Sequence, residues 1–191
     1  GHIGQKGYRL LMRLGRGLSL LIGGARSGKS DLAVQLGKAW PGTVTFIATA
    51  TAGDADMTER ISRHQQERPT SWTLVESPNF SASLAQGLAG DDLVIFDCIT
   101  LLVSNLMFAD TSEMAINRHV VELGQALSAR KAPTLVISNE VGLGIHPETE
   151  LGRTYRDTLG RANRSLAAAA EISLFVTAGK VLRLQDVTIS W

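Results

Sequence analysis

The segment Leu18-Ser19-Leu20-Leu21-Ile22-Gly23-Gly24-Ala25-Arg26-Ser27-Gly28-Lys29-Ser30 decides the fold class of this chain. Its second part satisfies the pattern G-x-x-x-x-G-K-S and stands between a short apolar strand and an amphipathic helix. In this context the glycines let backbone N–H groups curl around phosphate oxygens, and the start of the helix adds positive potential. A lysine then reaches the β and γ phosphates, and a serine hydroxyl can bind Mg²⁺. The segment therefore predicts a phosphate loop with Lys29 and Ser30 in these roles.

Short apolar strands alternate with helical stretches along the rest of the chain. Strands that are apolar throughout must be covered on both faces, and their alternation with helices favours a mainly parallel sheet. The last two strands are separated only by Ala178-Gly179, which predicts an antiparallel hairpin at the sheet edge. We therefore expect an α/β fold of the P-loop NTPase type, with helices flanking the sheet. The expected strands are 18–22, 44–48, 72–75, 93–97, 134–138, 172–177 and 181–184, and the expected helices are 29–39, 56–68, 81–88, 113–130 and 150–170.

Composition restricts the class of protein. The chain has 191 residues, of which 44% are hydrophobic and 19% charged, and these values exclude an intrinsically disordered chain. No apolar run is long enough to cross a bilayer, so we expect no stable membrane insertion. The single cysteine, Cys98, indicates a reducing compartment and hence the cytoplasm. We expect residues 1–16 to be a flexible extension or a cloning remnant, and 17–191 to form one nucleotide-binding domain.

The charge distribution excludes nucleic acid as a partner. The chain has 19 Lys and Arg residues against 18 Asp and Glu residues, yet four of the bases precede the first strand, so the folded body is mildly acidic. A broad basic face is what nucleic-acid binding needs. The aromatic residues are also too few and too scattered to form a base-stacking surface.

Polar residues follow the strands at the edge where a parallel sheet binds ligands. Asp97 ends the strand 93–97, where proteins with a phosphate loop place a carboxylate near the metal. An aspartate here would equally cap the next helix, but the phosphate loop favours metal or nucleotide binding. Glu140 follows the strand 134–138 and has two interpretations that remain open. It assists an acceptor hydroxyl or a metal, or it only bridges a glycine turn.

The segment 53–69 carries a histidine, His64, on the same helical stripe as Met57 and Ile61. Such a histidine is either a satisfied core residue or a catalytic one. Nearby arginines, among them Arg68, form either a polyphosphate clamp or a solvated face paired with glutamates. The residues themselves leave both alternatives open.

The combination of motifs resembles the bifunctional adenosylcobinamide kinase and adenosylcobinamide-phosphate guanylyltransferase family of cobalamin biosynthesis. The likeness runs from Leu18 to Leu184, and its order and spacing are far more specific than the phosphate loop alone. It rests on the segments 23–30, 47–49, 60–61, 68–69, 97–100, 105–106, 138–145, 147–148, 155–157 and 160–161 and on His64, Trp72, Glu76 and Asn163.

The resemblance implies two reactions. ATP or GTP phosphorylates the aminopropanol hydroxyl of adenosylcobinamide, and His64 then attacks the α-phosphorus of GTP to form a GMP-histidine that the phosphorylated corrinoid resolves to adenosylcobinamide-GDP. Mg²⁺ would be held by Ser30 and Asp97, and relatives assemble as homotrimers. Beyond the phosphate loop, the implied GTP contacts are Ala48, Thr49, Ala50, Gln65, Gln66, Glu67, Arg68, Glu76 and Asp97.

Two rival interpretations have different chemistry. In a small-molecule kinase with the same phosphate loop, the covalent guanylyl step is absent and His64 only packs. A GTP-dependent regulatory module is disfavoured because the sequence has no N-K-x-D guanine-reading motif.

Overall fold

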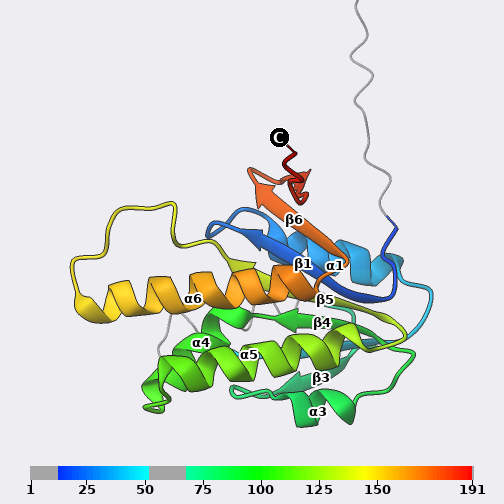
Figure 1. The fold of residues 1–191 in the computed structure, drawn as a ribbon. Coiled ribbons are helices and arrows are strands. Elements are labelled where there is room, and N and C mark those ends of the chain that lie inside the picture. The colour runs from blue at the N-terminus through cyan, green and yellow to red at the C-terminus, as the bar shows by residue number, and fades with distance from the viewer. Residues whose placement is uncertain (1–12, 52–67, 191) are drawn as a thin grey trace, which may run out of the picture.

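One seven-stranded sheet organises residues 13–51 and 68–190, the part of the chain that this computed structural model describes (Figure 1). The strand order is β3-β2-β4-β5-β1-β6-β7, and every neighbouring pair is parallel except β6 with β7. The expected parallel sheet with an antiparallel C-terminal edge is thereby confirmed. The strands are β1 (Gly17–Gly23), β2 (Val44–Ala48), β3 (Thr73–Glu76), β4 (Leu93–Asp97), β5 (Pro133–Asn139), β6 (Ile172–Thr177) and β7 (Lys180–Arg183).

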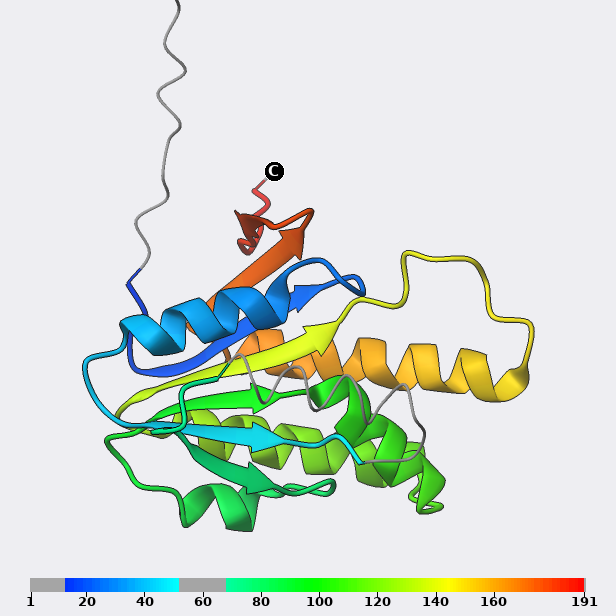
Figure 2. The same cartoon turned by 180° about the vertical axis from the view of Figure 1, so that it is seen from behind.

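Helices cover both faces of the sheet. Figure 2 shows α1 on one face, with α4, α5 and α6 on the other. Hydroxyl caps start several of them, because a free backbone N–H of the first turn needs an acceptor. Thr149, for example, accepts from the N–H of Gly152 at 3.0 Å. None of the helices in the described part of the chain is long and apolar enough to cross a membrane. The helices are α1 (Lys29–Ala39), α3 (Ala82–Gln86), α4 (Ile99–Phe108), α5 (Glu113–Ser128) and α6 (Glu150–Ala169).

Alternation along the strands builds a core on each face. In β1, Leu18 and Leu20 belong to the cluster under α4, α5 and α6, whereas Leu21 belongs to the cluster under α1. In β4, Phe96 faces the first cluster and Ile95 the second. Side chains of a strand point alternately to its two faces, so a central strand must be apolar at every position. This requirement explains why the apolar runs revealed the strands.

One helix was absent from the sequence prediction. The segment of α4 is apolar almost all round, so it carries no polar stripe from which a helical period could be recognised. Five of its residues are buried between the sheet and the neighbouring helices. The other boundaries agree with the prediction to within two residues, with β3 ending at Glu76 itself. The predicted helix 56–68 lies outside the described residues, apart from its last residue.

Candidate functional site

Backbone geometry shapes the phosphate loop between β1 and α1. Gly28, the N-cap of α1, has φ 100°, a left-handed conformation that glycine adopts without strain. Gly23 is needed for a different reason, because a Cβ there would lie 2.1 Å from the carbonyl oxygen of Val176 on β6. The turn after β6 also contacts the loop, since Gly179 donates its N–H to the Ser27 carbonyl at 2.9 Å. The loop is therefore fixed from the β6 side of the sheet.

The side chain of Lys29, which is expected to bind the β and γ phosphates, folds back onto the phosphate loop. Its side chain is only 6% exposed, and its Nζ donates to the carbonyls of Gly23 at 2.9 Å and Gly24 at 2.5 Å. The Ser27 hydroxyl accepts a third bond from Nζ at 3.2 Å. Ser30 follows in the first turn of α1. The ammonium is thus held at the helix N-terminus, where it adds to the positive potential that attracts phosphate.

The ends of β3, β2 and β4 form a second group, separated from the loop by β5. Ala48 pairs with Glu76 on one side and with Asp97 on the other, so the two carboxylates stand at the same level of the sheet. We call Glu76, Asp97 and Arg68 the carboxylate row. Gly23 pairs instead with Asn139 of β5, and β5 lies between β1 and β4. The site therefore has two halves on one edge of the sheet.

Arg68 is the cation of the carboxylate row. Its guanidinium lies 4.0 Å from the centroid of the Phe46 ring, a cation–π contact. Burial lowers the pKa of Arg68, while the charges of Asp97 and Glu76 act in the opposite direction. An arginine stays protonated at neutral pH through such changes. The row therefore combines one fixed cation with two carboxylates.

Thr49 fixes the strand ends beneath this row. It is fully buried, and its hydroxyl donates to the Cys98 carbonyl at 2.8 Å and accepts from the Cys98 N–H at 2.9 Å. Asn105 of α4 donates from Nδ2 to the carbonyls of Thr49 and Pro78, both at 2.9 Å. Ala50 follows Thr49 directly. Sequence reasoning gave Asn105 no role, although an amide in an otherwise apolar helix is the signal that points to it.

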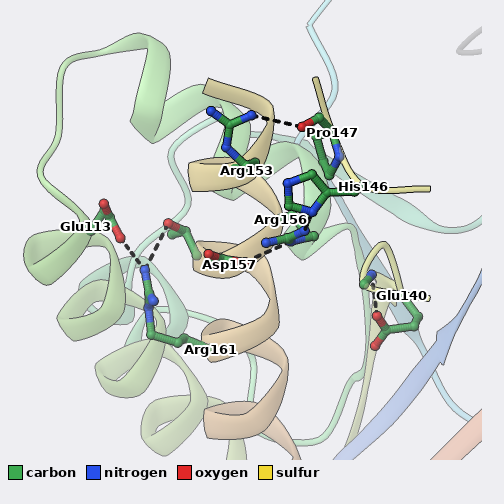
Figure 3. A network of polar contacts seen from close by, with 10 residues as sticks. Glu113, Glu140, His146, Pro147, Arg153, Arg156, Asp157 and Arg161 are labelled. Carbon is green, nitrogen blue, oxygen red and sulfur yellow. Dashed lines mark hydrogen bonds and ion pairs between the residues drawn. The ribbon is translucent and has the colours of Figure 1, made fainter. Parts of the chain in front are cut away.

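A polar network fastens the segment 140–149 to α6 (Figure 3). Arg153 donates to the carbonyls of Pro147 at 3.0 Å and Glu148 at 2.9 Å. Arg156 contacts Nδ1 of His146 at 3.0 Å and forms an ion pair with Asp157. Arg161, one turn further along α6, pairs with a glutamate of α5. Arg153 and Arg156 thus hold the far end of the segment in place, whereas Arg161 joins α6 to α5.

The predicted magnesium ligands, Ser30 and Asp97, supply hard oxygen atoms of the kind that Mg²⁺ prefers. Within residues 13–51 and 68–190, no group of three or more His, Cys, Asp or Glu side chains gathers to hold a metal. Mg²⁺ normally retains waters and binds through one or two protein ligands plus substrate phosphates. The donor set therefore fits a cation that arrives with a nucleotide.

Four predicted site residues lie outside the described residues: His64, Gln65, Gln66 and Glu67. The structure brings the other predicted residues to one sheet edge, in two halves. The phosphate loop and Lys29 form one half, and Thr49 with the carboxylate row forms the other.

Comparison with known proteins identifies close relatives. A profile of the family described as cobinamide kinase / cobinamide phosphate guanyltransferase matches residues 19–184. The bifunctional adenosylcobalamin biosynthesis protein CobP of Pseudomonas aeruginosa is 35% identical over 87% of this chain and 96% of its own length. The protein CobU of Salmonella typhimurium, with the same description, is 38% identical over 84% of this chain and 95% of its own length.

Likeness to solved structures concerns the fold alone. An ATPase from the type III secretion system of pathogenic bacteria superimposes with a TM-score of 0.54, covering 84% of this chain and 51% of the other at 10% identity. This agrees with the P-loop NTPase-type sheet expected from the sequence.

Proposed function

Because the chain belongs to the cobinamide kinase / cobinamide phosphate guanyltransferase family, we propose that it performs both of these reactions on adenosylcobinamide and that the second passes through GMP bound to His64. The observation that carries this proposal is the pairing of the phosphate loop with the carboxylate row on one sheet edge. A nucleotide lying along this edge meets a phosphate-binding half and a half that offers carboxylates to N–H donors.

In the kinase reaction, the aminopropanol hydroxyl of adenosylcobinamide attacks the γ-phosphorus of ATP or GTP. The bond from this phosphorus to the β–γ bridging oxygen breaks, and the nucleoside diphosphate leaves. Lys29 and the loop N–H groups hold the β and γ phosphates, which supplies orientation and charge stabilisation.

In the guanylyl transfer, a neutral His64 imidazole attacks the α-phosphorus of GTP and pyrophosphate leaves. A phosphate oxygen of adenosylcobinamide phosphate then attacks the same phosphorus, which releases His64 and gives adenosylcobinamide-GDP. Splitting one difficult displacement into two in-line steps is the advantage of covalent catalysis. Arg68 directly follows the predicted GTP-binding stretch Gln65, Gln66 and Glu67, and its cation stabilises phosphate charge.

The carboxylate row suits a guanine base. Guanine presents N1–H and an exocyclic amino group as neighbouring donors, and the two carboxylate oxygens of Glu76, at the end of β3, can accept from both. Neighbouring strands are about 4.8 Å apart, so the row lies about 10 to 19 Å from β1. An extended nucleoside triphosphate spans such a distance, which allows its phosphate tail to reach Lys29.

Ser30 and Asp97 would hold Mg²⁺, which neutralises phosphate charge when it is bound. The proposal also includes a homotrimer and a cytoplasmic location. A corrinoid is too broad to be enclosed by one domain of this size, so a neighbouring subunit would complete its cleft. A monomer with full activity in sedimentation and turnover assays would contradict this part.

The test of the covalent step uses GTP radiolabelled at the α-phosphate. We expect acid-labile, alkali-stable label on the protein, and none when the label is on the γ-phosphate. His64→Ala should remove the labelling, whereas His146→Ala, which changes an exposed histidine, should retain it. Labelling that survives in His64→Ala would refute the proposed nucleophile. A wild-type protein that phosphorylates adenosylcobinamide but takes up no label would favour the simple kinase.

A further inference from the structure

Glu140 directly follows β5, the strand that pairs with β1 beside the phosphate loop, and has no role in the two reactions described above. β5 pairs with β1 in parallel, with Asn139 opposite Gly23. Glu140 is the next residue, and its N–H donates to the Gly23 carbonyl at 3.0 Å. Asp97, the carboxylate at the end of β4, stands one strand further from β1. Of the two carboxylates at the ends of β4 and β5, Glu140 is therefore the one nearer to the loop.

Glu140 and Lys29 donate hydrogen bonds to the same acceptor atom. The Gly23 carbonyl oxygen accepts from the Glu140 N–H at 3.0 Å and from the Lys29 Nζ at 2.9 Å. The backbone of Glu140 is consequently close to the ammonium that is expected to bind the β and γ phosphates. This shared acceptor places an acidic residue beside the end of the triphosphate where the kinase reaction takes place.

The end of β5 is held by polar contacts with α4 and α6. Asn139 donates its N–H to the Thr100 hydroxyl at 2.9 Å, and its carbonyl accepts from Nδ2 of Asn163 at 3.0 Å. Oδ1 of Asn163 in turn accepts from the Ser138 hydroxyl at 2.6 Å. Both polar groups of the Asn139 backbone are therefore satisfied from α4 and α6. Such satisfaction fixes the position from which Glu140 extends.

The Glu140 side chain itself stays accessible. Oε1 accepts from the N–H of Gly142 at 2.6 Å, a local turn that leaves the second carboxylate oxygen for another donor (Figure 3). Glu140 takes part in neither the Arg156–Asp157 nor the Arg161–Glu113 ion pair of α6. The glycine turn of one sequence interpretation is thus present, and it engages only one of the two carboxylate oxygens.

From this placement we propose that Glu140 is the general base of the kinase reaction. The second carboxylate oxygen of Glu140 accepts the proton of the aminopropanol hydroxyl while the hydroxyl oxygen bonds to the γ-phosphorus. The bond to the β–γ bridging oxygen breaks, its electron pair leaves with the nucleoside diphosphate, and Glu140 later returns the proton to solvent. Guanylyl transfer needs no such base, because its attacking groups are a neutral imidazole and an ionised phosphate.

The two reactions make the test specific, and this inference rests on the kinase part of the proposed function. Glu140→Gln keeps the acceptor for the Gly142 N–H but cannot take up a proton. We expect it to lower kcat for phosphorylation of adenosylcobinamide by about 100-fold or more, with KM little changed. In the same preparation, α-label uptake from GTP and guanylylation of supplied adenosylcobinamide phosphate should stay within about threefold of wild type.

The matched control is Glu148→Gln, which removes the same charge from an exposed position in the same segment. Its kinase rate should equal that of the wild type. Glu140→Gln with near-normal kinase activity, or with both reactions reduced equally, overturns the inference. A wild-type chain without kinase activity overturns it as well. Absence of α-label from a wild-type chain with kinase activity refutes only the GMP-histidine, and the Glu140 comparison still stands.

Discussion

The two halves of the site differ in how they are built. The phosphate loop is continuous in sequence, and backbone groups shape it around Lys29. The carboxylate row collects Arg68, Glu76 and Asp97 from separate segments that meet only because β2 lies between β3 and β4. All residues of the loop come from one continuous segment, which later segments then support, whereas the row itself exists only after the sheet has assembled. Mutations should therefore affect the two halves differently.

The largest effect is expected from Lys29→Ala. Both reactions need the β and γ phosphates to be held, so both rates should fall by about 10²- to 10³-fold with the fold intact. Steady-state assays of kinase and guanylyl transfer, with circular dichroism for the fold, would measure this. Lys38→Ala, at the exposed end of the same helix, should leave both rates unchanged. If Lys29→Ala loses only one reaction, the two reactions do not share the loop.

A smaller and selective effect is expected from Arg68→Ala. Loss of this cation should slow α-label uptake from GTP by about 10- to 30-fold, in keeping with the value of a hydrogen bond to a charged group. Phosphorylation with ATP should change by less than about threefold, because Arg68 belongs to the carboxylate row. Arg164→Ala, at an exposed position of α6, is the control. An equal loss in both reactions would remove the distinction between the halves.

The same contrast explains what the sequence could predict. The loop was recognisable because its glycines, lysine and serine stand at fixed spacing. The sheet was predictable because its strands are apolar runs that alternate with helices. The strand order was not readable, so neither the neighbourhood of Glu140 and Gly23 nor the separation of Asp97 from β1 could be foreseen. Asn105 belonged to a segment of the family resemblance but received no role, because α4 has no amphipathic pattern from which a helix could be predicted. Contacts between distant segments depend on packing, which a linear pattern does not encode.

Asn105 offers a test of that assembly. Asn105→Ala leaves the carbonyls of Thr49 and Pro78 without their donor, so the free energy of unfolding should fall by about 1 to 3 kcal/mol. Urea denaturation would measure the change, and Gln125→Ala on the exposed side of α5 is the control. Nucleotide binding by the phosphate loop should persist in the folded variant. An unchanged midpoint of unfolding would show that these two bonds do not stabilise the row.

The smallest effect at neutral pH is expected from Tyr155→Phe. Burial raises the pKa of Tyr155 to about 12, and its hydroxyl donates to the Thr100 carbonyl at 3.1 Å. A raised pKa means that the folded state holds the phenol proton more tightly than the unfolded chain does. This stabilises the fold at pH values below about 10, the ordinary pKa of tyrosine, and the contribution is lost as the pH rises toward 12. The variant should lose about 1 kcal/mol at pH 8 and be less sensitive to alkali than the wild type. Parallel alkaline profiles in urea denaturation would contradict this account.

The contact between Gly179 and Ser27 has a consequence for synthesis on the ribosome. β1 is translated before both of its sheet neighbours, β5 and β6, which lie much later in the chain. The nucleotide-binding turn thus waits for these later segments before its supports exist. A product terminated before Gly179 lacks the last of them, so incomplete chains should not compete with the finished enzyme for GTP.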